Sequence, residues 1–193
     1  MLAISQDHGV YRKAMKSSAQ WEANAAYTVR SRFFTPPPLF EGCLTTFYHL
    51  SLEIDEAAGA GSTVEDYLQP EWGNIRFFSG SAPRGSMAGH RVSGSHFLAT
   101  GPSSLPCHFE LGATRMWGIG FLPMGWARFV DAPAYDLSNL LCDGSAHAAF
   151  AKFDALTPVL SDPGASEEEQ FNHIVTTLAG LMTPSRDEAK LVR

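Results

Sequence analysis

The spacing of apolar residues changes at Pro123, and this change constrains the fold more than any other feature of the chain. Before Pro123 apolar and polar residues alternate, as in residues 44–54, where Leu50 and Leu52 share one face. After it, apolar residues recur three and four positions apart, which is the period of a helix. The order of strands first and helices second predicts an α+β fold, a small antiparallel β-barrel or sandwich with helices beside it.

The strand signals extend from residue 33 to residue 122. Strands are expected at residues 44–54, 64–68, 74–78, 96–100, 106–111 and 115–122. Residues 79–95 are rich in Gly and Ser and predict a long loop. Residues 112–114 predict a tight turn that pairs the last two strands as a hairpin. Together these signals define a β half that covers residues 32–123.

The helical half is expected to cover residues 124–183, and its strongest helix signal lies at residues 167–182. Ser166 and Glu169 stand three positions apart at the start of that helix, which is the spacing of a capping box. Its apolar stripe contains Phe171, Ile174, Val175, Leu178, Leu181 and Met182. Weaker helical spacing occurs at residues 126–130, 137–141 and 150–157. The wide stripe predicts that the helical half mediates self-association as a homodimer.

Both ends of the chain are expected to lie outside these halves. Residues 1–31 are polar and Ala-rich and predict an N-terminal extension with a loose helix around residues 19–29. A Thr-Pro pair ends the helical half, and Ser185 and Glu188 then form a second capping box. Residues 184–193 therefore predict the start of a linker helix, as expected for one module of a longer protein. A frayed natural C-terminus is the alternative.

Charge and cysteine content exclude several classes of partner and site. The formal net charge is −6 and the pI is about 5.6, which argues against DNA or an anionic membrane as a direct partner. Cys43, Cys107 and Cys142 are too few and too scattered for a disulfide framework or a zinc site, so a reducing cytoplasm is expected. No apolar run approaches the roughly 20 residues of a membrane span, so no membrane partner is expected.

Motifs for catalysis are not evident. Residues 85–89 resemble a nucleophile elbow but have the wrong order, and no phosphate loop occurs. A metal site in a small β-barrel would use two histidines separated by one residue, followed by a glutamate. Candidate ligands exist in His90, His96, His108 and Glu110, but that pattern is missing, so surface or hydrogen-bonded histidines are the simpler interpretation. We therefore expect no catalytic residue, metal or cofactor.

Polar ligand-binding groups are concentrated in residues 70–78. On an extended chain Trp72, Asn74 and Arg76 project to one side, where amide and guanidinium groups beside an aromatic ring can hold a polar ligand. The alternative is that Arg76 pairs with a nearby acid and Trp72 fills the core.

A second segment, the strand at 115–122, adds Trp117 and Phe121 on a broad, mostly apolar face. The candidate ligand-binding residues are thus Trp72, Asn74, Arg76, Trp117 and Phe121. This mixture of rings and donors suits a small, partly aromatic or amphipathic molecule. The alternative is that the rings simply fill a narrow barrel.

The block at residues 115–139, RMWGIGFLPMGWARFVDAPAYDLSN, resembles the effector domain of AraC-type transcriptional regulators. Residues 34–54, 70–80 and 99–104 fall in the order that such N-terminal domains show, so that the resemblance covers about residues 33–182. It implies a cupin-like β-barrel with helices that dimerise or pack on a DNA-binding module. In this family a double helix-turn-helix follows, and this chain lacks it.

The resemblance implies the sensing and oligomerisation domain of a bacterial, cytoplasmic transcription regulator. In that case residues 32–123 form the sensing barrel for an unknown small-molecule effector, and DNA is bound only through the missing domain. A stand-alone cupin-like binding protein or enzyme is the alternative, and a dimerisation module without ligand is a third interpretation.

Overall fold

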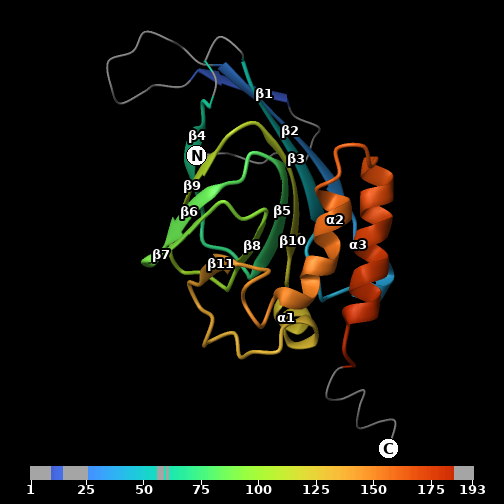
Figure 1. The fold of residues 1–193 in the computed structure, drawn as a ribbon. Coiled ribbons are helices and arrows are strands. Elements are labelled where there is room, and N and C mark those ends of the chain that lie inside the picture. The colour runs from blue at the N-terminus through green and yellow to red at the C-terminus, as the bar shows by residue number, and fades with distance from the viewer. Residues whose placement is uncertain (1–9, 15–25, 56–58, 60, 185–193) are drawn as a thin grey trace, which may run out of the picture.

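Two antiparallel sheets and a layer of helices make up the part of the chain that this computed structural model describes, residues 10–14, 26–55, 59 and 61–184. The larger sheet has the strand order β1-β2-β3-β10-β5-β8-β11, and the smaller one β4-β9-β6-β7. Figure 1 shows the smaller sheet on one side of the larger sheet and helices α2 and α3 on the other.

The larger sheet consists of β1 (Val10–Ala14), β2 (Ala26–Phe34), β3 (Phe47–Ile54), β5 (Asn74–Gly80), β8 (Phe97–Thr100), β10 (Thr114–Gly120) and β11 (Leu141–Asp143). The smaller sheet consists of β4 (Val64–Leu68), β6 (Arg84–Met87), β7 (His90–Ser93) and β9 (Cys107–Leu111). The helices are η1 (Pro38–Phe40), α1 (Pro123–Phe129), η3 (Ala151–Leu156), α2 (Thr157–Leu160) and α3 (Glu167–Leu181).

The two sheets do not close into a barrel. Within the described residues, no strand of one sheet pairs with a strand of the other. The fold is therefore sandwich-like, with antiparallel strands and helices that are mainly C-terminal. Of the two expected architectures, the sandwich is observed and the closed barrel is not.

Alternation along the strands lets the larger sheet bury side chains on both faces. On β10, Met116 points into the core between the two sheets. Trp117 and Ile119, at the alternate positions, point into the core beneath the helices. From α3, Ile174 and Leu178 enter that second core and are fully buried. The helices are thus held to the sheet by the burial of apolar surface on both elements.

Helix α3 begins as the sequence predicts. The Ser166 hydroxyl accepts the backbone N–H of Glu169 at 3.2 Å, and a Glu169 carboxylate oxygen accepts the Ser166 N–H at 2.8 Å. The Ser166 N–H and the Ser166 hydroxyl both donate to the Glu169 carboxylate and lower the pKa of Glu169. The stripe that predicted a dimer packs within the chain, because Ile174 and Leu178 are buried and the Phe171 ring stacks on Phe34. Self-association stays a prediction.

Residues 79–95 do not form the expected long loop. They contain the hairpin β6–β7, whose turn has positive φ at Ala88 (50°) and Gly89 (86°). Two adjacent positive φ values match the twist of a tight hairpin, so the Gly in this segment is a turn residue rather than a sign of irregular chain.

The prediction of a hairpin with its turn at residues 112–114 is also wrong. Strand β9 belongs to the smaller sheet and β10 to the larger one, so Gly112 and Ala113 carry the chain between sheets. Each strand pairs instead with partners distant in sequence, β9 with β4 and β6, and β10 with β3 and β5.

Local signals failed in two further segments. Residues 26–29 belong to β2 rather than to a loose helix, so regular strand begins inside the expected N-terminal extension. The helical spacing at 137–141 corresponds to turns followed by β11. The expected second capping box and linker helix lie at residues 185–193, outside the described residues. No helix in the described ranges is long and apolar enough to cross a membrane.

Candidate functional site

A cluster of polar side chains lies between the two sheets and is formed around Arg76 of β5. Alternation along β5 directs Asn74 and Arg76 to the same face as Phe78, which belongs to the inter-sheet core, and Ile75 and Phe77 to the helix side. We call the set Tyr48, Glu71, Asn74, Arg76 and Thr100 the Arg76 cluster.

Three side chains bind the Arg76 guanidinium. Its Nε donates to the Tyr48 hydroxyl at 2.9 Å, and its Nη1 donates to Thr100 Oγ1 at 3.5 Å. Its Nη2 forms an ion pair with Glu71 Oε1. Only 5% of Arg76 is exposed, whereas 32% of the Glu71 side chain is exposed. The carboxylate therefore reaches the buried cation from the rim of the sandwich.

Two glycines of β10 give the cluster its space. A Cβ on Gly118 would lie 1.9 Å from Cζ of Tyr48, so the Tyr48 ring reaches Arg76 only because that position lacks a side chain. A Cβ on Gly120 would lie 3.4 Å from the Asn74 amide nitrogen and 2.5 Å from Thr45 Oγ1. The two glycines share one face of the strand, and their small size is needed for close approach rather than for a turn.

Burial and charge set the protonation states in the cluster. Burial raises the pKa of Tyr48, and the Arg76 guanidinium only partly opposes this. Burial acts to lower the pKa of Arg76, but Glu71 and Tyr48 outweigh it and the net pKa is raised. The nearby Cys107 thiol also has its pKa raised by burial, which Arg76 opposes. The site thus holds a permanent cation next to a neutral phenol and a neutral thiol.

One buried polar atom of the cluster has no partner. The Asn74 amide nitrogen donates to Glu71 Oε2 at 3.4 Å, while Asn74 Oδ1 makes no hydrogen bond although Asn74 is 4% exposed. Exchanging the amide oxygen and nitrogen would set two oxygens face to face, so Glu71 fixes the orientation. An unmade hydrogen bond at a buried acceptor costs about 1–3 kcal/mol.

Three loops enclose the rim beside Glu71. The Glu71 N–H donates to Ser103 Oγ at 3.0 Å and the Ser103 N–H to the Glu71 carbonyl at 2.9 Å. Asn139, at φ 57°, accepts the N–H groups of Ser104 and Leu105 through its side-chain oxygen at 2.8 and 3.2 Å. Residues 69–73, 101–106 and 131–140 are thereby tied together beside Glu71.

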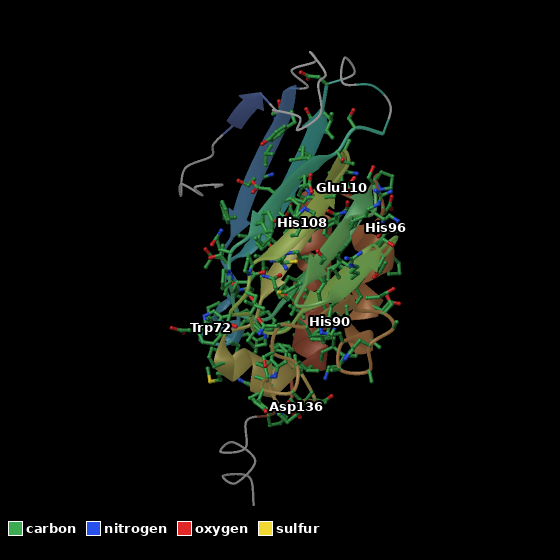
Figure 2. All side chains as sticks on the ribbon, turned by 90° about the vertical axis from the view of Figure 1, so that its left-hand side faces the viewer. Trp72, His90, His96, His108, Glu110 and Asp136 are labelled. Carbon is green, nitrogen blue, oxygen red and sulfur yellow. The ribbon has the colours of Figure 1, made fainter. Side chains whose placement is uncertain are left out.

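The five candidate residues predicted from the sequence do not meet. Asn74 and Arg76 lie together between the sheets, as their spacing predicts. Trp72 lies on the rim (Figure 2), and 53% of it is exposed. Trp117 and Phe121, each 1% exposed, lie in the core on the helix side of the sheet.

Three members of the Arg76 cluster were missed by sequence reasoning, namely Tyr48, Glu71 and Thr100. They come from β3, a loop and β8, and no local spacing connects them. The Gly118-x-Gly120 pattern was the available signal, because two small residues on one strand face indicate the close approach of another group.

A second polar site lies on the helix side of the larger sheet. Trp117 Nε1 donates to Gln170 Oε1 of α3 at 2.7 Å, and the Trp117 ring lies 5.0 Å from the ring of His49. His49 Nδ1 lies 3.5 Å from Glu167 Oε1. Burial lowers the pKa of His49, with Glu167 opposing and Arg115 and Arg32 adding to the shift.

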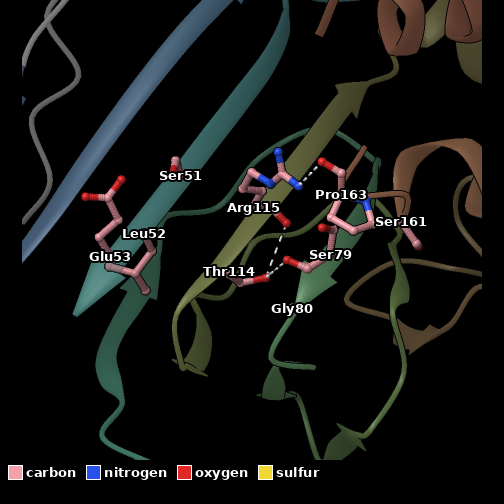
Figure 3. Close-up of a pocket in the computed structure, with 9 residues that line it drawn as sticks. All are labelled: Ser51, Leu52, Glu53, Ser79, Gly80, Thr114, Arg115, Ser161 and Pro163. Carbon is pink, nitrogen blue, oxygen red and sulfur yellow. Dashed lines mark hydrogen bonds between the residues drawn. The ribbon is translucent and has the colours of Figure 1, made fainter. Parts of the chain in front are cut away.

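An open depression of about 390 Å³ is lined in part by Arg115, whose charge adds to the pKa shift of His49 (Figure 3). It is lined by Ser51, Leu52, Glu53, Ser79, Gly80, Thr114, Arg115, Ser161 and Pro163. An Nη2 of Arg115 donates to the Pro163 carbonyl at 3.2 Å, and Ser161 Oγ is buried without a partner. It is a shallow surface feature, in contrast to the enclosed Arg76 cluster.

Of the candidate metal ligands, His90, His108 and Glu110 lie on strands of the smaller sheet, whereas His96 lies just before β8 of the larger sheet (Figure 2). His108 Nε2 contacts Glu65 Oε1 at 2.6 Å, Glu110 pairs with Arg84 at 3.3 Å, and His96 Nδ1 contacts the Phe78 carbonyl at 3.2 Å. Over the ranges that the structure describes, no three His, Cys, Asp or Glu side chains are placed to share a metal ion.

No family model matches the chain, and no curated protein matches its sequence. Among solved structures it is similar to the Clostridium difficile EutQ protein, with 13% identity and a TM-score of 0.34 over 52% of this chain and 71% of that one. It is also similar to a predicted oxalate decarboxylase from Thermotoga maritima, with 12% identity and a TM-score of 0.35 over 63% of this chain and 98% of that one. These TM-scores are too low to carry an argument, so the fold rests on the observed strand order.

Proposed function

We propose that the chain is a cupin-like small-molecule binding domain whose ligand occupies the region of the Arg76 cluster between the two sheets. The observation that carries the proposal is a buried guanidinium whose neighbour, Asn74, keeps an unpartnered oxygen. The ligand supplies the missing donor to that oxygen.

A purely structural role explains the cluster less well. A buried ion pair contributes little to stability, because desolvation of both charges offsets their attraction. Apolar side chains of similar volume would fill the same space at no greater free energy. The arrangement at Arg76 is instead what a binding site needs, a few convergent polar groups in an otherwise apolar interior.

The resemblance to AraC-type regulators leads us to propose a sensory role for this binding. The domain would act in the cytoplasm as a homodimer, without catalysis, metal or cofactor, and would control a DNA-binding module outside this chain. The acidic charge of the chain supports the part of the proposal that places DNA binding elsewhere. A stand-alone binding protein or enzyme is the alternative.

A thermal-shift screen of small polar metabolites tests the binding function. A ligand should raise the unfolding temperature and change the fluorescence of Trp72 on the rim, and both effects should vanish in Arg76→Lys, which keeps the charge but loses the planar fork. Binding that persists unchanged in Arg76→Lys contradicts the proposed site. The reading frame beyond codon 193 tests the regulatory role, since a helix-turn-helix there supports it and an immediate stop favours the alternative.

A further inference from the structure

We propose that Glu71 is a built-in substitute for the ligand, and that the ligand is a small carboxylate with a hydrogen-bond donor next to its carboxyl group. This inference rests on the proposed function and specifies its ligand class. On binding, the ligand's carboxylate takes the position that the Glu71 carboxylate holds on Arg76 and Asn74.

Charge balance at Arg76 requires the ligand to be an anion. The guanidinium is buried and permanently charged, and removing the partner of a buried charge is strongly unfavourable. Tyr48 and Thr100 occupy Nε and Nη1 but bring no charge. A neutral ligand that displaced Glu71 would leave the cation uncompensated, whereas a carboxylate restores the pair.

Glu71 is the member of the cluster that can leave. It lies in the irregular segment 69–73, and a third of its side chain is exposed. When its carboxylate leaves Arg76 it can therefore turn into water, where the charge is hydrated and carries no burial cost. Asn74, Arg76 and Thr100 lie on strands of the larger sheet and are buried. Departure of Glu71 therefore opens the rim while the rest of the site keeps its geometry.

The two oxygens of Glu71 define how the incoming carboxylate sits. Oε1 contacts Arg76 Nη2 and Oε2 accepts from Asn74 Nδ2, so one carboxylate spans a guanidinium and an amide. The unpartnered Asn74 Oδ1 is bonded to the same carbon as that Nδ2. A 2-hydroxy acid carries a hydroxyl donor on the carbon next to its carboxylate, so its hydroxyl would donate to Asn74 Oδ1 while its carboxylate accepts from Nδ2, which favours 2-hydroxy acids over simple acids.

Lactate, propionate and lactamide are the probes that test this exchange. By calorimetry, lactate should bind the wild type in preference to propionate, and lactamide should not bind. Glu71→Gln removes the competing carboxylate, so lactate should bind it at least about 10-fold more tightly than the wild type, a difference of about 1.4 kcal/mol. Glu65→Gln is the matched control, because Glu65 is exposed and contacts His108 on the smaller sheet; its lactate affinity should equal that of the wild type.

A second variant keeps the test decisive if Glu71→Gln is too unstable to titrate. Glu71→Ala leaves Arg76 without its ionic partner and creates space, so lactate should raise the unfolding temperature of this variant more than that of the wild type, and lactamide should not. Equal lactate affinity in the wild type and Glu71→Gln, or no rescue of Glu71→Ala, overturns the exchange. If instead lactamide or another neutral metabolite binds in an Arg76-dependent way, the binding function stands and the carboxylate class is wrong.

Discussion

At the scale of single residues, the Arg76 cluster depends on the absence of side chains at Gly118 and Gly120 as much as on the side chains that form it. Alternation along the sequence placed Asn74 and Arg76 on one face, and the structure brings them together. It gave no information on Tyr48, because the contact of Tyr48 with Arg76 depends on the pairing of β3, β10 and β5 and on the absence of a side chain at Gly118. Pairing between distant strands is not encoded in local spacing.

Gly118→Ala should destabilise the protein by about 1–3 kcal/mol, because the added methyl group overlaps the Tyr48 ring and displaces it from Arg76. Urea unfolding measures the change. Gly180→Ala in α3 is the control, since a Cβ there meets no atom within 4 Å and alanine favours helix. A Gly118→Ala protein as stable as the wild type would show that the Tyr48 ring is not confined by β10.

His49 should make the fold less stable in mild acid. Its pKa in the folded state is lowered by burial, so the unfolded chain takes up a proton at a higher pH than the folded one. Stability contributed by neutral His49 is therefore present above its unfolded pKa of about 6.5 and is lost as the pH falls through the folded value. Unfolding free energies measured between about pH 7.5 and pH 5 should fall less steeply in His49→Gln than in the wild type. His90→Gln, at an exposed position, is the control and should follow the wild type.

At the scale of elements, the sequence located most strands but not their partners. Strand β4 has the predicted bounds and α3 begins at the predicted capping box. The Gly- and Ser-rich composition of residues 79–95 predicts a loop, whereas Gly89 lies in the tight turn of the β6–β7 hairpin. The pairing of β9 with β10 was wrong because alternation defines the faces of a strand and not its neighbour.

The capping box of α3 should contribute measurably to the stability of the helical layer. Ser166→Ala removes the acceptor for the Glu169 N–H and should lower the free energy of unfolding by about 1 kcal/mol. Thr176→Ala, at an exposed position of the same helix, should change it by no more than about 0.5 kcal/mol. Thermal or urea unfolding compares the two. A Ser166→Ala protein that matches Thr176→Ala would show that water replaces the cap without loss.

At the scale of the whole molecule, a chain of direct contacts links the Arg76 cluster to the end of α3. Gly73, two residues after Glu71, is so close to α1 that a Cβ there would lie 2.3 Å from the Trp126 ring. The Gly73 carbonyl also accepts the N–H of Phe121, just before α1. At the other end of α1, the Arg128 carbonyl accepts Thr183 Oγ1 at 2.7 Å. Movement of residues 69–73 would therefore act on α1 and, through it, on the segment that follows α3.

Ligand binding at Arg76 should change the hydrogen exchange of Thr183, whose N–H donates to the Arg128 carbonyl at 3.1 Å. If lactate displaces Glu71, residues 69–73 move against α1, and peptides covering α1 and residues 181–184 should exchange at a different rate. Lactate would then bind the two conformations of these segments with different affinity, which is the only way in which a ligand shifts a conformational equilibrium. The β6–β7 hairpin, which lies in the other sheet, is the internal control and should not change.

Thr183→Val removes the hydroxyl bond to Arg128 while keeping the side-chain shape, so it should reduce the effect at residues 181–184 and leave lactate affinity unaltered. A ligand that binds at Arg76 without altering exchange at α1 would mean that binding is not transmitted along this path, and a sensory role would then need another route through the helical layer.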